Sequence, residues 1–281
     1  MKITRSNEIE SQVKAVNESK AELLGLIQKR LEVAQDQGEA TEVWQDLLGE
    51  VGAISEAFSV SKEIVPYDEV DRRGSFFSGP FFVSKEFPVP LGKSGQMRPL
   101  VQFDMDTLSK AVGSNLGSGL LQLWYDLKTH NDLIRIIPAD AVETQELVDF
   151  QVDPLDDQSA FPLPIWMELD PVENGVEVIN GLVSIGFEAT SWLSVPDSQP
   201  SSDLDGQLCI SMSEFERMSH GLGYDDFLVG GTLFVIQYTY SDVKMRQLLR
   251  FSEWGSSGSA EIFFQSNPDG STEFSFWACF R

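Results

Sequence analysis

The chain has few of the residues that build metal sites, disulfide frameworks and catalytic triads. It contains only 2 His and 2 Cys among 281 residues. The histidines, His130 and His220, have no second His or Cys at metal-ligand spacing. The cysteines, Cys209 and Cys279, lie far apart without a CxxC motif, so we expect buried free thiols. The composition therefore predicts no metal, no cofactor and no disulfide framework.

Basic residues are also scarce. Lys and Arg number 20 against 44 Asp and Glu, which gives a formal net charge of −24. Phosphate backbones and anionic membrane surfaces both require clustered Lys and Arg, so the charge disfavours nucleic-acid and membrane binding. A strongly acidic chain instead associates quickly with basic partners. We therefore predict a basic protein partner, with no role for nucleic acid or membrane.

Long apolar runs are missing as well. The first residues lead directly into polar sequence without the apolar core of a signal peptide, and no stretch approaches the ~18 apolar residues of a membrane span. The sequence therefore predicts a cytoplasmic protein.

Two glycine-containing segments resemble catalytic motifs without matching them. The 181–186 segment places Ser184 one residue away from its position in a nucleophile elbow, and no helix is expected after it. The 113–119 segment is rich in glycine but does not end in the Gly-Lys-Ser/Thr of a phosphate-binding loop. We therefore predict a protein without enzymatic activity.

The first part of the chain has the spacing of two amphipathic helices. Apolar residues recur at three- and four-residue intervals over 7–35, and Gly38 follows as a stop signal. A second apolar stripe begins after Thr41 and extends to Phe58. We predict that residues 1–65 form a helical region in which the two helices pair as a hairpin.

After Pro66 the apolar runs shorten to the length of strands. The segments 81–83, 100–103, 120–127, 133–137, 227–240, 247–251, 260–265 and 273–280 read as strands, and 106–112 as a short helix behind an Asp cap. Two further strands, 176–179 and 183–189, flank Asn180-Gly181, a strong hairpin signal. Residues 66–281 are therefore predicted to form a mainly antiparallel β-rich domain of an α+β protein.

Two parts of this domain resemble each other. Each contains a glycine turn, a strand, a connection, an apolar strand, a loop and an aromatic strand, within about 74–140 and 225–281. The pattern predicts two similar β-rich halves. Coincidence among unrelated strands remains the alternative.

The segments that carry this echo also resemble the YwqG-like family of bacterial proteins over roughly residues 74–281. The similar stretches are Gly95–Asp104, Gly119–Tyr125, Phe161–Pro164, Leu228–Gln237, Gln247–Phe251 and Trp254–Gly258. The resemblance implies an α+β fold with internal duplication. The chain departs from the family pattern at Ser256, where an Asp usually follows Trp-Gly, and at Phe87, where Trp usually precedes Pro.

The acidic residues gather in one stretch. Positions 151–244 contain sixteen Asp and Glu but only two basic residues, Arg217 and Lys244, which gives a net charge of −14. If these carboxylates share one face, they would attract a cationic protein, and nearby aromatic residues would anchor it. The predicted partner-binding residues are Asp153, Asp156, Asp157, Trp166, Glu168, Asp170, Glu173, Trp192, Asp203, Asp205, Tyr224, Asp225 and Asp226.

These features are typical of an immunity protein that binds and neutralises a cognate bacterial toxin domain encoded by a neighbouring gene. The alternative is a small molecule or peptide bound in a cleft between the two halves, or an unrecognised enzyme there. The residues expected to line such a cleft are Gln102, Gly230, Gly231, Gln237, Trp254 and Gly255. A satisfied inward amide is the other interpretation of both Gln102 and Gln237. A filament or scaffold subunit is a third possibility.

Overall fold

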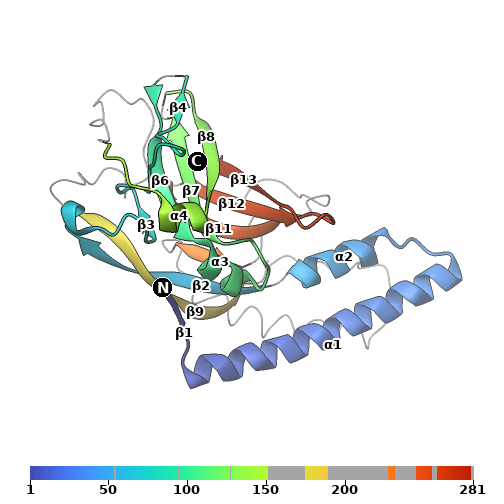
Figure 1. Ribbon diagram of the computed structural model, residues 1–281. Coiled ribbons are helices and arrows are strands. Elements are labelled where there is room, and N and C mark those ends of the chain that lie inside the picture. The colour runs from blue at the N-terminus through green and yellow to red at the C-terminus, as the bar shows by residue number, and fades with distance from the viewer. Residues whose placement is uncertain are drawn as a thin grey trace.

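The computed structural model describes residues 1–53, 55–93, 95–126, 128–150, 175–188, 227–231, 245–254 and 258–279. These residues form a helical hairpin and a large antiparallel sheet, which makes the protein α+β as expected (Figure 1). Among the described residues, no helix is both long enough and apolar enough to cross a lipid bilayer.

The hairpin consists of α1 (Asn7–Gln37) and α2 (Glu42–Ala53). Ser6 caps α1, because its hydroxyl accepts a hydrogen bond from the Ile9 amide at 3.3 Å. Gly38 ends α1 in the left-handed conformation, as its position in the sequence predicts. The two helices share a core of their own, formed by Val13, Val16, Leu23, Ile27, Leu31, Ala34, Trp44, Leu47 and Val51.

The second helix is shorter than its apolar spacing suggests. It ends at Ala53, and Ser55–Val65 form the strand β2. The expectation of a helix up to Phe58 is therefore wrong. Phe58 is fully buried in the sheet, where β2 pairs with strands on both sides. This tertiary pairing outweighs the local helical spacing.

The sheet is centred on β2 and β9 (Val176–Glu188), which pair antiparallel along the whole of β2. Beside this pair lies β1 (Lys2–Thr4), and the 3₁₀ turn η1 (Tyr67–Glu69) follows β2 along the chain. A separate two-stranded hairpin is formed by β4 (Leu91–Gly92) and β5 (Gly95–Gln96). Among the described strands only β1 pairs in parallel, and its partner is β9.

The single strand β9 replaces the hairpin expected around Asn180-Gly181, so that prediction is wrong. A Cβ atom at Gly181 would lie 2.6 Å from the Lys2 carbonyl oxygen. Lys2 pairs with Gly181 in the ladder between β1 and β9. The glycine therefore permits the close approach of a neighbouring backbone and makes no turn.

Two arms extend from the central pair. The first arm is β3 (Phe76–Phe77), β6 (Arg98–Asp104), β7 (Gly119–Asp126) and β8 (Asn131–Pro138). The second arm is β10 (Leu228–Gly230), β11 (Arg246–Trp254), β12 (Gly258–Ser266) and β13 (Thr272–Cys279). The order of the described strands is β13-β12-β11-β10-β2-β9-β3-β6-β7-β8, with β1 beside β9 off this path. From either end, three consecutive strands are followed by a short strand and then by a central strand.

The short strand of each arm does not pair with the central strand that precedes it along the chain. β3 follows β2 along the chain but pairs with β9, whereas β10 follows β9 but pairs with β2. The strands predicted at 100–103, 120–127, 133–137, 247–251, 260–265 and 273–280 are confirmed within a few residues. Residues 81–83, expected as a strand, form no regular element.

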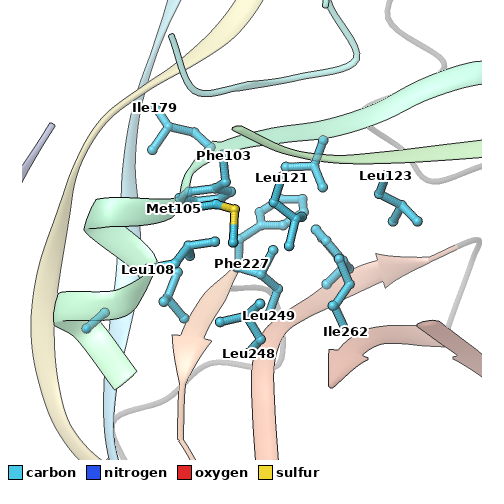
Figure 2. Packing of buried hydrophobic residues seen from close by; sticks show 14 of the residues in the cluster. Phe103, Met105, Leu108, Leu121, Leu123, Ile179, Phe227, Leu248, Leu249 and Ile262 are labelled. Atoms are coloured by element: carbon cyan, nitrogen blue, oxygen red, sulfur yellow. The ribbon is translucent and has the colours of Figure 1, made fainter. Parts of the chain in front are cut away.

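The main core lies between the two arms. The helix α3 (Met105–Val112) and the inner faces of both arms enclose one cluster of buried side chains. Figure 2 shows Leu121 and Leu123 of the first arm on the opposite side of this cluster from Leu248, Leu249 and Ile262 of the second. A last short helix, α4 (Ala139–Thr144), follows β8 and packs on β7.

The sheet curls far enough for its two terminal strands to meet. β8 and β13 lie at opposite ends of the strand order but are in contact, and the Tyr125 ring of β7 lies 6.1 Å from the Phe276 ring of β13. No backbone pairing joins β8 to β13 in the described part of the sheet. This boundary between β8 and β13 is called the seam below.

Candidate functional site

The predicted acidic partner surface lies outside the described residues. Every member from Asp153 to Glu173 and from Trp192 to Asp226 falls there, as do Gln237 and Gly255 of the predicted cleft. Of the remaining cleft residues, Gln102 lies on β6, Gly230 ends β10 and is followed by Gly231, and Trp254 ends β11.

Gln102 lies at the centre of a buried polar network on the outer face of the first arm. Its Nε2 group donates to the carbonyl oxygens of Arg72 at 3.0 Å and Gly74 at 2.7 Å. Its Oε1 atom accepts from the Phe82 amide at 2.9 Å and from Nε2 of Gln122 at 2.7 Å. Both glutamines are fully buried. The Gln102 amide has therefore used its whole hydrogen-bonding capacity within the protein.

Gln122 connects this hydrogen-bond network to Arg135 of β8. Its Oε1 atom accepts from Nη2 of Arg135 at 2.7 Å and from the Trp124 indole at 3.0 Å. Arg135 also donates to the Pro88 carbonyl at 2.6 Å, and its guanidinium lies 5.3 Å from the Trp124 ring centre. Burial lowers the pKa of Arg135 to about 10, so it remains charged at neutral pH.

A second arginine, Arg72, also binds this segment. Arg72 donates to the carbonyl oxygens of Pro80, Phe81 and Val148, and forms an ion pair with Asp149 at 3.3 Å. Together with Gln102, Gln122 and Arg135 it forms what we call the outer clamp, which holds residues 78–90 against the first arm. Side chains therefore supply the hydrogen bonds of both backbone groups of Phe82 and of the Phe81 carbonyl, while the Val83 carbonyl accepts from the Val148 amide. The buried segment 81–83 is satisfied in this way without a strand ladder.

The glycine pair of the predicted cleft is packed against β2. Gly230 and Gly231 have φ angles of 72° and 90°, which are accessible to glycine at little cost. The Gly231 amide donates to the Glu56 carbonyl at 3.1 Å, and its own carbonyl accepts from the Ser55 hydroxyl at 2.6 Å. A Cβ atom on Gly230 would lie 2.8 Å from the Glu56 carbonyl oxygen. The turn therefore docks the second arm onto the central pair.

A small polar cluster lies beside this turn. The Glu56 carboxylate forms an ion pair with Arg5 at 3.0 Å and accepts from the Ser184 hydroxyl at 2.5 Å. Ser184, considered above for a nucleophile elbow, is fully buried in the middle of β9, where its hydroxyl donates to Glu56. The Ser184 hydroxyl thus helps to hold β9 against β2.

Gln247 of β11 is a buried amide side chain beside the glycine turn. Its Nε2 group donates to the Gly230 carbonyl at 3.1 Å, while its Oε1 atom has no hydrogen-bond partner within the described part of the chain. The side chain is almost fully buried. Gln247 therefore holds the turn less completely than Gln102 holds the outer clamp.

The β7–β8 turn carries a group of ionisable side chains that the sequence did not single out. Nδ1 of His130 lies 3.1 Å from the Tyr125 hydroxyl, and Asp126 and Asp132 flank the pair. Burial, reinforced by these two carboxylates, raises the pKa of Tyr125 to about 12. Tyr125 thus stays protonated at neutral pH, and His130 completes a turn in which its own φ is 54°.

The seam is the other feature that sequence reasoning missed. Apolar side chains on both terminal strands pack on the main core without being fully covered. These are Ile134 and Ile136 of β8 and Phe274, Phe276 and Ala278 of β13. Their alternation was visible in the sequence, but the meeting of β8 and β13 depends on the curvature of the whole sheet.

No three His, Cys, Asp or Glu side chains in the described ranges lie together in a way that could hold a metal ion. Comparison with known proteins adds no assignment, because no protein-family model and no curated protein matches the chain.

Proposed function

We propose that this protein is a non-enzymatic, acidic protein-binding module, and specifically an immunity protein that binds and neutralises a cognate bacterial toxin domain. The observation that carries the proposal is the net charge of −24, more than half of which lies between positions 151 and 244. A field of this sign accelerates association with a cationic partner and opposes binding to nucleic acid.

The local chemistry of the described residues is consistent with a binding role. The buried polar side chains of the outer clamp bond to their own chain, which makes them supports for the fold. The alternative of a ligand cleft between the two halves draws less support. Apolar side chains from both arms fill the space between them.

We also infer that the chain descends from a duplicated β-rich unit, as the resemblance to the YwqG-like family implies. The strand order supports this inference, because β2-β3-β6-β7-β8 and β9-β10-β11-β12-β13 follow the same path in each half. The exchange of β3 and β10 between the central strands would then join the two copies.

The proposed function is tested with the purified chain and the purified product of the adjacent gene. We expect a 1:1 complex whose Kd rises at least about tenfold between low and physiological salt, because exposed charges are screened beyond roughly 8 Å at 0.15 M. Calorimetry at the two salt concentrations measures this change. A salt-independent Kd, or a neighbour that is not a toxin, contradicts the proposal.

A matched pair of charge variants locates the interaction. The triple variant Asp153→Asn, Asp156→Asn and Asp157→Asn removes three charges from the predicted surface. The triple variant Glu8→Gln, Glu10→Gln and Glu18→Gln removes the same charge from α1. We expect the first to slow association several-fold more than the second. Equal effects would show that only the total charge matters.

A further inference from the structure

We propose that the open edge of β8 is a docking site for an extended segment of the partner protein, with alternating apolar and cationic residues, which adds a strand beside β8 and covers the seam. This inference rests on the proposed function, since it names the surface through which a cationic partner would be held.

The first argument is the backbone of β8. All eight of its residues are in register with β7, from Asn131 opposite Asp126 to Pro138 opposite Gly119. No other strand pairs with β8 in the described part of the sheet, although β13 lies close by. Backbone groups on the far side of such a strand point outward and can pair with an added strand. Pro138, which lacks an N–H group, lies only at the end of this edge.

The second argument is the distribution of incompletely covered apolar side chains. In the described ranges seven hydrophobic side chains pack on the main core while remaining partly exposed, and five of them belong to the seam. Leu133 of β8 is in addition 38% exposed on the opposite face of the strand. An added strand would therefore remove apolar surface from water on both faces of β8.

The third argument is charge. Asp132 lies at one end of the seam and Glu273, which is exposed, lies on β13. Arg135 is the sole basic residue of β8, and its guanidinium is engaged by Gln122 and the Pro88 carbonyl. Lys128, in the preceding turn, is the exposed cation nearest along the chain. The edge thus offers carboxylates to an incoming segment, which selects a cationic strand over an acidic one.

The test uses the full chain and a synthetic peptide of alternating valine and lysine. The control peptide has the same side-chain sequence and charge, but all of its backbone amides are N-methylated, so neither edge can donate hydrogen bonds to β8. We expect the unmodified peptide to bind at least about tenfold more tightly by fluorescence anisotropy, and to protect amides within 131–138 from hydrogen exchange. Equal binding of both peptides, or protection confined to other strands, would overturn the inference.

A matched pair of variants tests the same edge without relying on the peptide chemistry. Leu133→Lys places a cation on β8, and Val33→Lys places one on α1, at a position that is also 38% exposed. We expect Leu133→Lys to weaken peptide binding about tenfold and Val33→Lys to leave it within about twofold. Equal binding by the two variants contradicts the docking site. Self-association of the chain through 131–138, detected by gel filtration with hydrogen exchange, would also contradict it.

The same variants separate this inference from the proposed function. If the chain binds the cognate toxin and Leu133→Lys binds it as well as Val33→Lys does, the edge is not the docking site and the proposed function stands. If the peptide docks on β8 but no complex forms with the toxin, the edge is a docking site and the proposed function fails.

Discussion

The two arms of the sheet share one strand order but carry different chemistry on matching rows. A row runs across each arm through residues in register. In the first arm it consists of Phe76, Gln102, Gln122 and Arg135. In the second arm it consists of Leu228, Arg250, Glu261 and Trp277. The equivalence follows from the ladders alone, since each short strand is followed by the same three antiparallel partners.

The difference lies in what each terminal strand does with its outer side chain. Arg135 of β8 turns onto Gln122 and closes the outer clamp. Trp277, its counterpart on β13, is 48% exposed. In the first arm the polar side chains of this row therefore hydrogen-bond within the protein. In the second arm a large aromatic side chain is partly exposed to solvent. Two arms with the same strand order thus differ in how the side chains of this row are used.

The largest expected effect comes from breaking the outer clamp. Gln102→Leu removes an amide that makes four hydrogen bonds and leaves the buried Phe82 amide and the partly buried Gly74 carbonyl without their partner. Each such group costs about 1–3 kcal/mol, so we expect the free energy of unfolding to fall by roughly 3 kcal/mol or more. Urea denaturation measures this fall. Gln96→Leu, at an exposed position on β5, is the control.

The corresponding change in the second arm should cost much less. Gln247→Leu removes one hydrogen bond, to the Gly230 carbonyl, together with an Oε1 atom that has no partner. We expect a loss of only about 1 kcal/mol in the same measurement. If the two substitutions prove equally costly, the contrast between a saturated first arm and a less saturated second arm is wrong.

A further effect is expected at the turn that docks the second arm. Gly230→Ala imposes a side chain at a φ of 72° and places its Cβ atom 2.8 Å from the Glu56 carbonyl oxygen. Gly113→Ala imposes nearly the same φ, 62°, where nothing lies within 4 Å. The backbone strain of about 1–2 kcal/mol should be common to both. We expect Gly230→Ala to be the more destabilising by thermal unfolding, and equal costs would mean that the turn yields without resistance.

The sequence predicted most of the strands because their signals are local. Leu100–Phe103, Leu133–Ile137 and Ala260–Gln265 are short apolar runs bounded by polar or turn residues, and each lies within an observed strand. The N-cap of α3 was also predicted from the sequence as an Asp. In the structure Asp104 is this cap, and it accepts a hydrogen bond from the Thr107 amide at 3.1 Å. Signals of this kind do not depend on what the rest of the chain does.

The failures all involve contacts between distant segments. Phe58 has helical spacing to Val51, but β9 and β10 recruit it into a strand. Asn180-Gly181 has the chemistry of a turn, yet Gly181 is required by the approach of Lys2. The seam likewise arises only when β8 and β13, far apart in the order of strands, are brought together. No local pattern specifies these encounters.

The smallest effect concerns Asp132, where the first arm has a carboxylate and the second arm has Phe274 at the matching position. Burial raises the pKa of Asp132 above its ordinary value, so the folded protein holds this proton more tightly than the unfolded chain does. Above the raised pKa the charge therefore lowers stability, and this cost disappears as the pH falls through that pKa.

Asp132→Asn should accordingly raise the melting temperature slightly at neutral pH. The advantage should shrink as the pH falls through the raised pKa and vanish below the ordinary pKa of Asp, near 3.8. Melting curves from neutral to acid pH measure the trend, with Asp140→Asn on α4 as a control. A gain that persists in acid would show that the asparagine itself packs better, and a loss at neutral pH would mean that the carboxylate is needed at the edge even without a partner. Only the predicted trend is consistent with a carboxylate that weakens the free first arm and is kept available for a cation.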